Sequence, residues 1–245
     1  MRLLVYNIAY GTGSLEGDYD RLWTLHRYIK TSHSHLDRII EFIGKKKPDI
    51  IGLVEIDTGS YRTNFVNQAE LIASRLGHYQ HSSVKYGKLS LGRAVPIMKK
   101  QANAILTKKA AGTSKFHFFP RGVKKLVIEL ETNGVRIFLV HLALRKKIRE
   151  EQLRFLAGLV KSDKPTVVAG DFNTFSGPEE LDAFCKKLKL VNPNRKGHST
   201  YPSWEPNRQL DHILCSKHIK IKRFTVPMVK FSDHLPLIMD FTVVK

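Results

Sequence analysis

Cysteine is scarce in this sequence, with Cys185 and Cys215 the only two among 245 residues. They fall in different predicted elements and show no zinc-ligand spacing, which argues against a disulfide framework and a cysteine-based zinc site. We therefore expect a reducing, cytoplasmic environment. No apolar run approaches the roughly 18 residues of a membrane-spanning helix, and the stretch from Arg2 to Asn7 is too short for the core of a signal peptide. The sequence predicts no transmembrane segment.

Acidic residues are in short supply as well. The chain has 22 Asp and Glu against 41 Lys and Arg, a formal net charge of +19 at pH 7. Such a field attracts polyanions, so nucleic acid is the first partner we expect and an anionic lipid surface the second. A basic surface that serves solubility alone is the alternative. The glycine-rich segment 11–17 lacks the G-x-G-x-x-G spacing, so no dinucleotide site is predicted there.

Hydrophobic periodicity predicts strands and helices along the whole chain. A strong hairpin signal, Asn133-Gly134, joins two of the strands. This order of elements favours an α/β fold in which two mixed β-sheets pack face to face with helices outside. No Pro/Ser-rich linker interrupts the chain, so we expect a single domain over residues 1–245, and a monomer. The predicted helices cover 34–47, 67–76, 146–160 and 178–188, with a short helix over 21–30, and the predicted strands cover 3–8, 49–55, 79–83, 102–107, 123–131, 135–141, 166–169, 209–216, 220–227 and 237–244.

Asn7 and Glu55 each stand at the end of a predicted buried strand. An amide oxygen and a carboxylate are hard ligands, and they suit a Mg²⁺ or Mn²⁺ ion that keeps several waters and meets a substrate phosphate. We interpret both residues as candidate metal ligands. An Asn in a turn and a Glu capping the surface are the structural alternatives.

His141, Asp171 and Asn173 also follow predicted strands. In a phosphate-binding cleft, His141 would donate a hydrogen bond to a non-bridging oxygen and stabilise charge in the transition state. A histidine satisfied at the edge of the core is the alternative. Asp171 can orient or deprotonate a water, and Asn173 can hold the attacked phosphoryl oxygen. For these two the alternative is a Gly-Asp turn capped by its own side chains.

Asp233 and His234 are adjacent just before the last predicted strand, and Asp211 lies on another strand. A carboxylate beside an imidazole fixes the tautomer of the ring and favours its protonated form. A protonated His234 next to a scissile phosphate would act as a charge partner or general acid. We expect Asp211 to orient His234, which leaves Asp233 to join the metal shell. A lone Asp-His pair is more often a solvated loop, so its weight comes from the accompanying sites.

Taken in order, these motifs resemble the endonuclease/exonuclease/phosphatase superfamily over essentially the whole chain. The resemblance implies a four-layer α/β sandwich and magnesium-dependent cleavage of phosphodiesters or phosphomonoesters. The matching segments are Tyr6-Asn7-Ile8, Val54-Glu55, His141-Leu142, Gly170-Asp171-Phe172-Asn173, Leu210-Asp211-His212-Ile213 and Ser232-Asp233-His234-Leu235-Pro236. The implied roles are metal binding by Asn7 and Glu55 with Asp233 near the ion, phosphate contact by His141 and Asn173, water activation by Asp171, and an Asp211–His234 pair.

Further segments resemble the bacterial metal-dependent hydrolase branch of this superfamily. They are Asn103-Ala104-Ile105-Leu106, Pro120-Arg121-Gly122 and Thr200-Tyr201-Pro202-Ser203. One departure matters, because the abasic-site endonucleases carry an acid two residues after the first Asn, where this chain has Ala9. That departure places a strict abasic-site role in doubt.

Charge is the main guide to the substrate, since the fold alone does not settle it. We expect Lys99 and Lys100 to contact the substrate, because the basic loops near strand ends would form a rim that matches a phosphate backbone. Asn103 and Arg121, from the segments that resemble the bacterial branch, are the other expected substrate contacts. Trp23, Tyr86 and Trp204 would stack on bases or only pin their loops.

Three classes of function remain open. The first is a divalent-metal-dependent phosphodiesterase, a nuclease on DNA or RNA. The second is a phosphatase or phosphodiesterase on a small anionic or lipid substrate. The third is a catalytically silent nucleic-acid-binding module, which the intact set of site residues argues against.

Overall fold

The structure is a computed structural model, and it describes residues 1–13, 33–84, 100–110, 112–161 and 163–244. The predicted helix over 21–30 and the residues Trp23, Tyr86 and Lys99 lie outside the described residues. The strands are β1 (Arg2–Asn7), β2 (Ile50–Asp57), β3 (Tyr79–Val84), β4 (Gln101–Thr107), β5 (Ser114–Phe118), β6 (Leu126–Thr132), β7 (Val135–His141), β8 (Thr166–Asp171), β9 (Asp211–Cys215), β10 (Ile219–Thr225) and β11 (Leu237–Val243). The α-helices are α2 (His33–Lys46), α3 (Gln68–Leu76), α4 (Lys146–Leu159) and α5 (Asp182–Leu188), and short 3₁₀ turns cover Ala9–Gly11, Tyr61–Thr63 and Pro178–Leu181.

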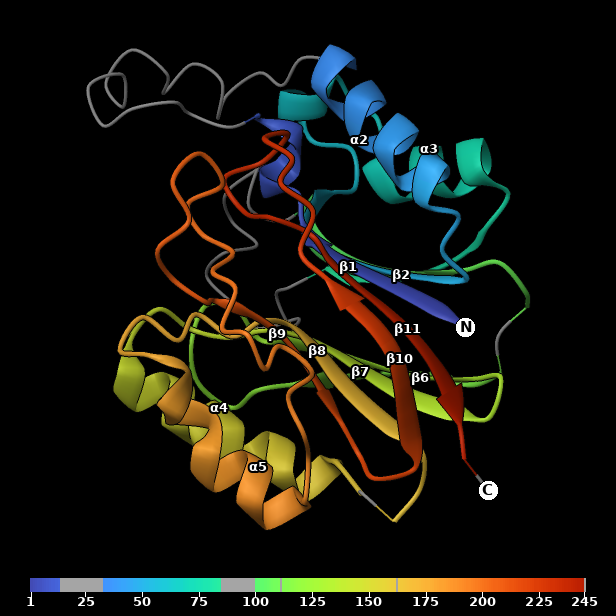
Figure 1. The fold of residues 1–245 in the computed structure, drawn as a ribbon. Coiled ribbons are helices and arrows are strands. Elements are labelled where there is room, and N and C mark those ends of the chain that lie inside the picture. The colour runs from blue at the N-terminus through green and yellow to red at the C-terminus, as the bar shows by residue number, and fades with distance from the viewer. Residues whose placement is uncertain (14–32, 85–99, 111, 162, 245) are drawn as a thin grey trace.

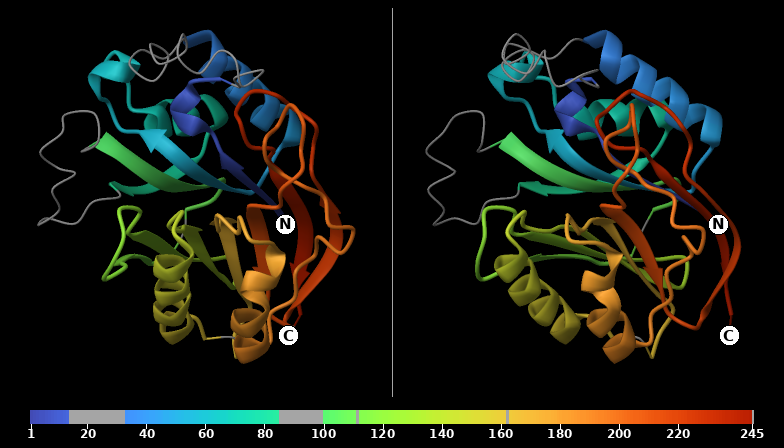
Figure 2. Two further views of the ribbon diagram at one scale, coloured as in Figure 1. Left: turned by 90° about the vertical axis from the view of Figure 1, so that its left-hand side faces the viewer. Right: turned by 60° about the vertical axis from the view of Figure 1, so that its left-hand side comes forward.

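Two mixed sheets form the middle of the molecule. One has six strands in the order β10-β11-β1-β2-β4-β3, and the other has five in the order β5-β6-β7-β8-β9. The pairs β1–β2 and β7–β8 are parallel, and the other neighbours are antiparallel. Helices α2 and α3 cover the outer face of the first sheet, and α4 and α5 cover that of the second (Figures 1 and 2). The predicted α/β sandwich of four layers is confirmed.

Alternation along β1 shows why its apolar run is continuous. Leu3 and Val5 belong to the cluster between the two sheets, whereas Leu4 and Tyr6 belong to the cluster under α2 and α3. Successive side chains of a strand point to opposite faces, so a strand covered on both faces is apolar at every position. A third cluster, which includes Phe138 and Leu156, fills the space between the second sheet and its two helices.

Most predicted elements occur within a few residues of their expected bounds. The predicted hairpin is present, with positive φ at both Asn133 and Gly134, as a two-residue turn between β6 and β7 requires. The strand predicted over 123–131 begins later, at Leu126, and β5 was not predicted at all. β5 is a short outer strand that is largely exposed, and Phe116 and Phe118 are its only apolar residues, so its apolar pattern is weak.

Among the helices that the structure describes, none has both the length and the apolar character needed to cross a bilayer.

The topology brings six strand ends to one edge of the sandwich. In the first sheet the parallel strands β1 and β2 end side by side, with Asn7 opposite Val54, and the antiparallel β11 starts beside them. In the second sheet β7 and β8 end with His141 opposite Asp171, which in turn lies opposite Asp211 at the start of β9. Each predicted site residue on these strands therefore arrives at the same edge.

At Gly170 the backbones of β7 and β8 leave no room for a side chain. Its φ is +139°, and a Cβ placed there would overlap the backbone carbonyl oxygen of Val140 on the neighbouring strand β7. We expect Gly170→Ala to lower the free energy of unfolding by on the order of 3 kcal/mol or more, because backbone must move next to Asp171. Urea denaturation at constant m-value measures this loss.

Gly134→Ala is the matched control. Gly134 also has a positive φ, +74°, but no atom lies within 4 Å of the position of an added Cβ. Gly134→Ala should lower the free energy of unfolding by about 1–2 kcal/mol, the ordinary penalty for a side chain in the left-handed backbone region. Equal losses in the two variants would show that β8 shifts freely to admit the methyl group.

Candidate active site

Asp171 stands at the centre of the site and joins the two sheets. Its Oδ2 accepts a hydrogen bond of 3.0 Å from Nδ2 of Asn7 on the other sheet and lies 3.2 Å from Nε2 of His141. Burial on its own raises the pKa of a carboxyl group, but here His141 and His234 outweigh it and hold the pKa of Asp171 below its usual range. Asp171 is therefore a buried, ionised carboxylate.

Asn173 completes the turn after β8. It adopts a positive φ of +53°, and its backbone N–H donates to Oδ1 of Asp171 at 3.0 Å. Its Nδ2 donates to the carbonyl of Leu142 at 2.9 Å, which ties this turn to the one after β7. The geometry fixes Asn173 beside Asp171, and it contains the self-capping turn that the sequence offered as an alternative.

Asp211, at the start of β9, and His234, in the turn before β11, meet as a close pair. Nδ1 of His234 lies 2.7 Å from Oδ2 of Asp211, and Nε2 lies 3.9 Å from Oδ2 of Asp171. Burial would lower the pKa of His234, but the charges of Asp211 and Asp171 outweigh it and raise that pKa to about 10. Thr200 supports the pair by donating from Oγ1 to Oδ2 of Asp211 at 2.7 Å.

Glu55 is presented by a β-bulge. The register of β2 against β4 shifts between Leu53 and Ile56, and Glu55 itself has a φ of +56°. Its backbone N–H donates to Oδ1 of Asn103 at 3.3 Å. Because Asn103 is buried beneath this bulge, its side chain supports Glu55, and a contact between Asn103 and substrate stays a prediction.

Lys124 is a site residue that the sequence did not single out. Its Nζ contacts Nε2 of His141 and lies 3.7 Å from Oε1 of Glu55. Gln152 on α4 holds the loop in place by donating to the carbonyls of Arg121 and Lys124 at 3.1 Å. Only the basic character of this segment pointed to it, since no periodic pattern marks a loop that folds back onto a strand end.

The remaining predicted substrate contacts lie near the rim. The Arg121 side chain is largely exposed and lies 3.3 Å from Glu151 on α4. Lys100 precedes β4 and accepts a backbone hydrogen bond from Thr58, just after β2. Whether either residue meets substrate stays a prediction.

Asp233 lies in a turn that is anchored to β1. Oγ of Ser232 donates to the backbone carbonyl of Asn7 at 2.8 Å, which places the Asp-His pair next to the end of β1. Burial is the main reason that the pKa of Asp233 is raised, since His234 offsets it only in part and Glu55 adds repulsion. Half-buried carboxylates that repel one another, such as Asp233 and Glu55, fit a hard divalent cation when an amide oxygen donor lies beside them.

A second group of possible ligand atoms lies nearby. Those of Asp171, Asp211 and His234 are within 4.8 Å of one another, so this acidic and histidine cluster could bind a metal ion. A protonated imidazole has no lone pair to offer, however. With His234 protonated between two carboxylates, this group forms an ion-paired relay, and Asn7, Glu55 and Asp233 stay the predicted metal ligands.

His212 is buried next to the site and stays neutral. Burial lowers its pKa to about 4. Its Nε2 lies 3.0 Å from Oγ1 of Thr174 and 3.2 Å from the carbonyl of Gln209, and its ring packs edge-on against Phe172. His212 thus pins the turn that carries Asn173 to the strand that carries Asp211, a role the sequence did not predict.

Aromatic rings form one wall at the rim. The ring of Tyr201 lies 4.9 Å from that of His234, and the partly exposed Phe175 meets Tyr201 edge-on at 6.3 Å. The guanidinium of Arg208 lies 5.4 Å from the Phe175 ring centroid. Trp204, which we expected to stack or to pin its loop, is half-buried in the same segment.

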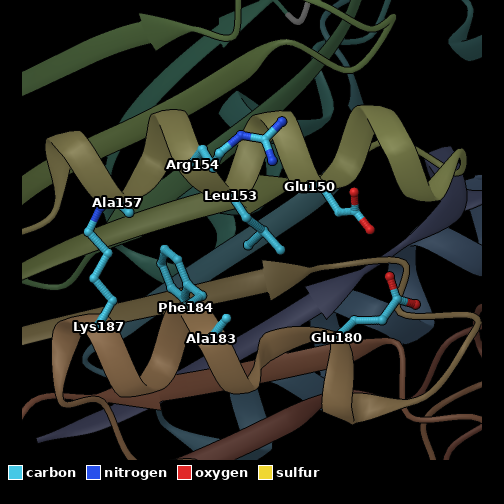
Figure 3. A pocket seen from close by; sticks show the side chains of 8 residues that line it. All are labelled: Glu150, Leu153, Arg154, Ala157, Glu180, Ala183, Phe184 and Lys187. Carbon is cyan, nitrogen blue, oxygen red and sulfur yellow. The ribbon is translucent and has the colours of Figure 1, made fainter.

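A groove of about 200 Å³ lies elsewhere, between α4 and α5. Figure 3 shows its floor of Leu153 and Phe184, with Glu150 and Glu180 toward one end. None of the predicted site residues lines it, and it lies on the outer helical layer.

Comparison with known proteins identifies the family of this chain and agrees with its fold. Residues 4–234 match the Endonuclease/Exonuclease/phosphatase family, whereas no curated protein matches the chain. Among solved structures, an endonuclease/exonuclease/phosphatase from Beutenbergia cavernae is 18% identical, with a TM-score of 0.75 over 100% of this chain and 72% of that one. An AP endonuclease from Archaeoglobus fulgidus is 17% identical, with a TM-score of 0.68 over 99% of this chain and 100% of that one. A mannosyl-6-phosphatase from Bacteroides thetaiotaomicron is 17% identical, with a TM-score of 0.72 over 99% of both chains. The family match covers most of the sequence, and the chain therefore belongs to the endonuclease/exonuclease/phosphatase family.

Proposed function

We propose that this protein is a divalent-metal-dependent phosphodiesterase that cleaves the backbone of DNA or RNA. The observation that carries the proposal is the buried relay of Asp171, His234 and Asp211, with His141 and Glu55 beside it, at one edge of the sandwich. In phosphoryl transfer to water, an ionised carboxylate can activate the water and a cationic imidazole can stabilise the charge that develops on the phosphoryl oxygens.

Asp171 is the group we assign to the water nucleophile. Its pKa is held low by its histidine neighbours, so it is ionised and can accept a hydrogen bond from a water and take its proton as the oxygen attacks phosphorus. Asn7 and the backbone of Asn173 orient its two oxygens. His141 and Asn173 are proposed to donate to the phosphoryl oxygens, as the superfamily resemblance implies.

His234 is the group we assign to the developing negative charge. The carboxylate of Asp211 accepts from Nδ1, so the proton on Nε2 is directed away from Asp211. A cation there stabilises the transition state more than the ground state, because negative charge accumulates on the phosphoryl oxygens during the reaction. Asp211 acts through His234 and is a positioning residue.

The proposed holders of the metal are Asn7, Glu55 and Asp233, with Mg²⁺ or Mn²⁺ as the ion. When bound, such an ion supplies Lewis-acid stabilisation to a phosphoryl oxygen. The ammonium group of Lys124 lies 3.7 Å from the carboxylate of Glu55, where its positive charge would attract a substrate phosphate.

Two features favour nucleic acid over a small phosphoester. The rings of Tyr201 and Phe175 stand at the rim next to His234, and base stacking on such rings tolerates any sequence. The formal net charge of +19 favours a polyanion. A similar fold in a mannosyl-6-phosphatase keeps hydrolysis of a small or lipid phosphoester as the alternative.

A substrate panel tests the proposal directly. We expect hydrolysis of single-stranded or duplex oligonucleotides with Mg²⁺ or Mn²⁺ and none with EDTA, while phosphomonoesters and phospholipids react more slowly. Asp171→Ala, purified in parallel, is the control for contaminating nuclease and should be inactive. Hydrolysis of sugar phosphates or phospholipids alone would replace the nuclease proposal with the alternative.

Glu55→Gln should weaken binding of the ion without unfolding the protein. The change removes one negative charge from the oxygen donors, so we expect at least about a tenfold loss in Mn²⁺ affinity by calorimetric titration, and reduced turnover. Glu150→Gln, which removes a carboxylate from the outer groove of α4, is the matched control and should bind as the wild type does. Full activity of Glu55→Gln in limiting magnesium would remove Glu55 from the metal site.

Asp211→Asn and His234→Ala should behave as changes to one unit. Each alone should cost on the order of 10²–10⁴-fold in single-turnover rate, and the double variant should cost little more, since residues that act together are strongly non-additive. The measurement is a double-mutant cycle at saturating magnesium. Asp171→Ala removes water activation and should be a separate defect. If the Asp211 and His234 losses multiply, Asp211 does not act through His234.

A further inference from the structure

A second concave surface carries a concentration of positive charge. A groove of about 380 Å³ lies between the 193–198 loop and strand β10, and we call it the β10 groove. Its cationic or titratable members are Arg195, Lys196, His198, Lys222 and Arg223, and none of the residues that line it is acidic. None of the residues predicted for the active site lines it.

The loop wall of the groove is built by a buried asparagine. The side chain of Asn194 accepts a hydrogen bond from the backbone N–H of His198 at 3.0 Å and donates to the carbonyl of His198 at 2.8 Å. Arg195 and Lys196 therefore stand at the tip of a turn with fixed ends, and both are exposed. The turn is what holds two cations at the mouth of the groove.

The strand wall owes its charge to a β-bulge. The register of β10 against β11 shifts between Ile221 and Arg223, so Lys222 is the extra residue. Neighbouring side chains of a regular strand point to opposite faces, but a bulge re-aims them. Lys222 and Arg223 consequently line the same groove.

Protection of an outer strand is the simplest explanation for lysines on β10, which is the last strand of its sheet (Figure 1). That explanation does not account for Arg195 and Lys196, which approach from another part of the chain. Among the described residues, Arg195, Lys196 and Lys222 form no ion pair. Like charges brought together without acids are unfavourable unless an anion joins them.

We propose that the β10 groove binds the phosphate backbone of a nucleic acid whose scissile bond lies in the active site. The proposal rests on the nuclease function proposed above. His198, on the loop wall of the groove, is three residues before Tyr201, whose ring lies 4.9 Å from that of His234. The Cα atoms of His198 and Tyr201 are therefore at most about 11 Å apart, so the loop wall begins roughly three phosphates of one DNA strand from the rim of the active site. The partly exposed Phe224 in the groove offers a ring for a base.

The test compares a variant that lacks three positive charges of the groove with a control variant that lacks three positive charges elsewhere. The groove variant combines Arg195→Ala, Lys196→Ala and Lys222→Ala. The control combines Lys161→Ala, Lys186→Ala and Lys187→Ala, exposed residues that follow α4 or lie on α5 and carry the same total charge. Binding of fluorescent DNA and RNA oligonucleotides, long enough to reach from the site across the groove, is measured by anisotropy in EDTA over a range of salt. Hydrolysis of bis(p-nitrophenyl) phosphate is measured with Mn²⁺.

We expect the groove variant to bind oligonucleotides more weakly and with a flatter dependence on salt. The slope of log affinity on log salt should fall by about two units, because each phosphate of a single strand that the protein neutralises contributes about 0.7. The control should keep the wild-type slope, and both variants should hydrolyse the small diester at the wild-type rate. Equal slopes in the groove variant and the wild type, or equal losses in both variants, would overturn the proposal. Groove-dependent binding to phosphatidylserine vesicles without oligonucleotide binding would overturn it in favour of a membrane surface.

The two proposals fail separately in this experiment. If the wild type cleaves oligonucleotides while the groove variant binds them with wild-type affinity, the groove proposal falls and the nuclease proposal stands. If groove-dependent oligonucleotide binding is present but no phosphoester is cleaved under any metal condition, the groove proposal stands and the nuclease proposal falls.

Discussion

The hydrogen bond from Asn7 to Asp171 joins the ends of β1 and β8 across the interface between the two sheets. Each partner depends on a strand of a different sheet, so the bond forms only when the sheets pack in one relative position. The cluster of apolar residues between the sheets sets that position. The packing of the two sheets therefore also fixes the geometry of the site. A small shift of either sheet would separate the amide of Asn7 from the carboxylate of Asp171.

Buried charge is the second consequence of this arrangement. Asp171, Asp211 and His234 are all buried, and an unpaired ion in such a place is strongly unfavourable. The cost is offset by pairing, since His234 lies between two carboxylates and Thr200 and Asn173 supply hydrogen bonds to them. The same pairing lowers the pKa of Asp171 and raises that of His234, whereas burial still raises the pKa of Asp211. The contacts that stabilise these buried groups are thus the same contacts that set their protonation. A substitution of one residue therefore affects both stability and reactivity.

The sequence predicted the strands that carry the site because each strand ends at a clear change from apolar to polar residues. Buried strands read as apolar runs, and a polar residue such as Asn7 or His141 at the end of a run marks a sheet edge. The sequence could not predict how Asn103 and Lys124 are used, because both depend on tertiary contacts. Asn103 meets Glu55 only through a bulge between β2 and β4, and Lys124 meets His141 only because α4 holds its loop. Spacing along the chain carries no signal of either contact.

Two β-bulges place polar side chains where the regular alternation of a strand would not. Alternation along a strand sends neighbouring side chains to opposite faces, which suits a layered core but scatters functional groups. At Glu55 the bulge turns a carboxylate out of a buried strand toward the site, and at Lys222 it gathers two cations on one side of β10. The first lies next to the relay, where small shifts of a carboxylate matter, and the second lies on an outer strand, where charge can change without disturbing the core. The fold thus separates the candidate site, fixed by the packing of both sheets, from an outer strand whose charge is independent of that packing.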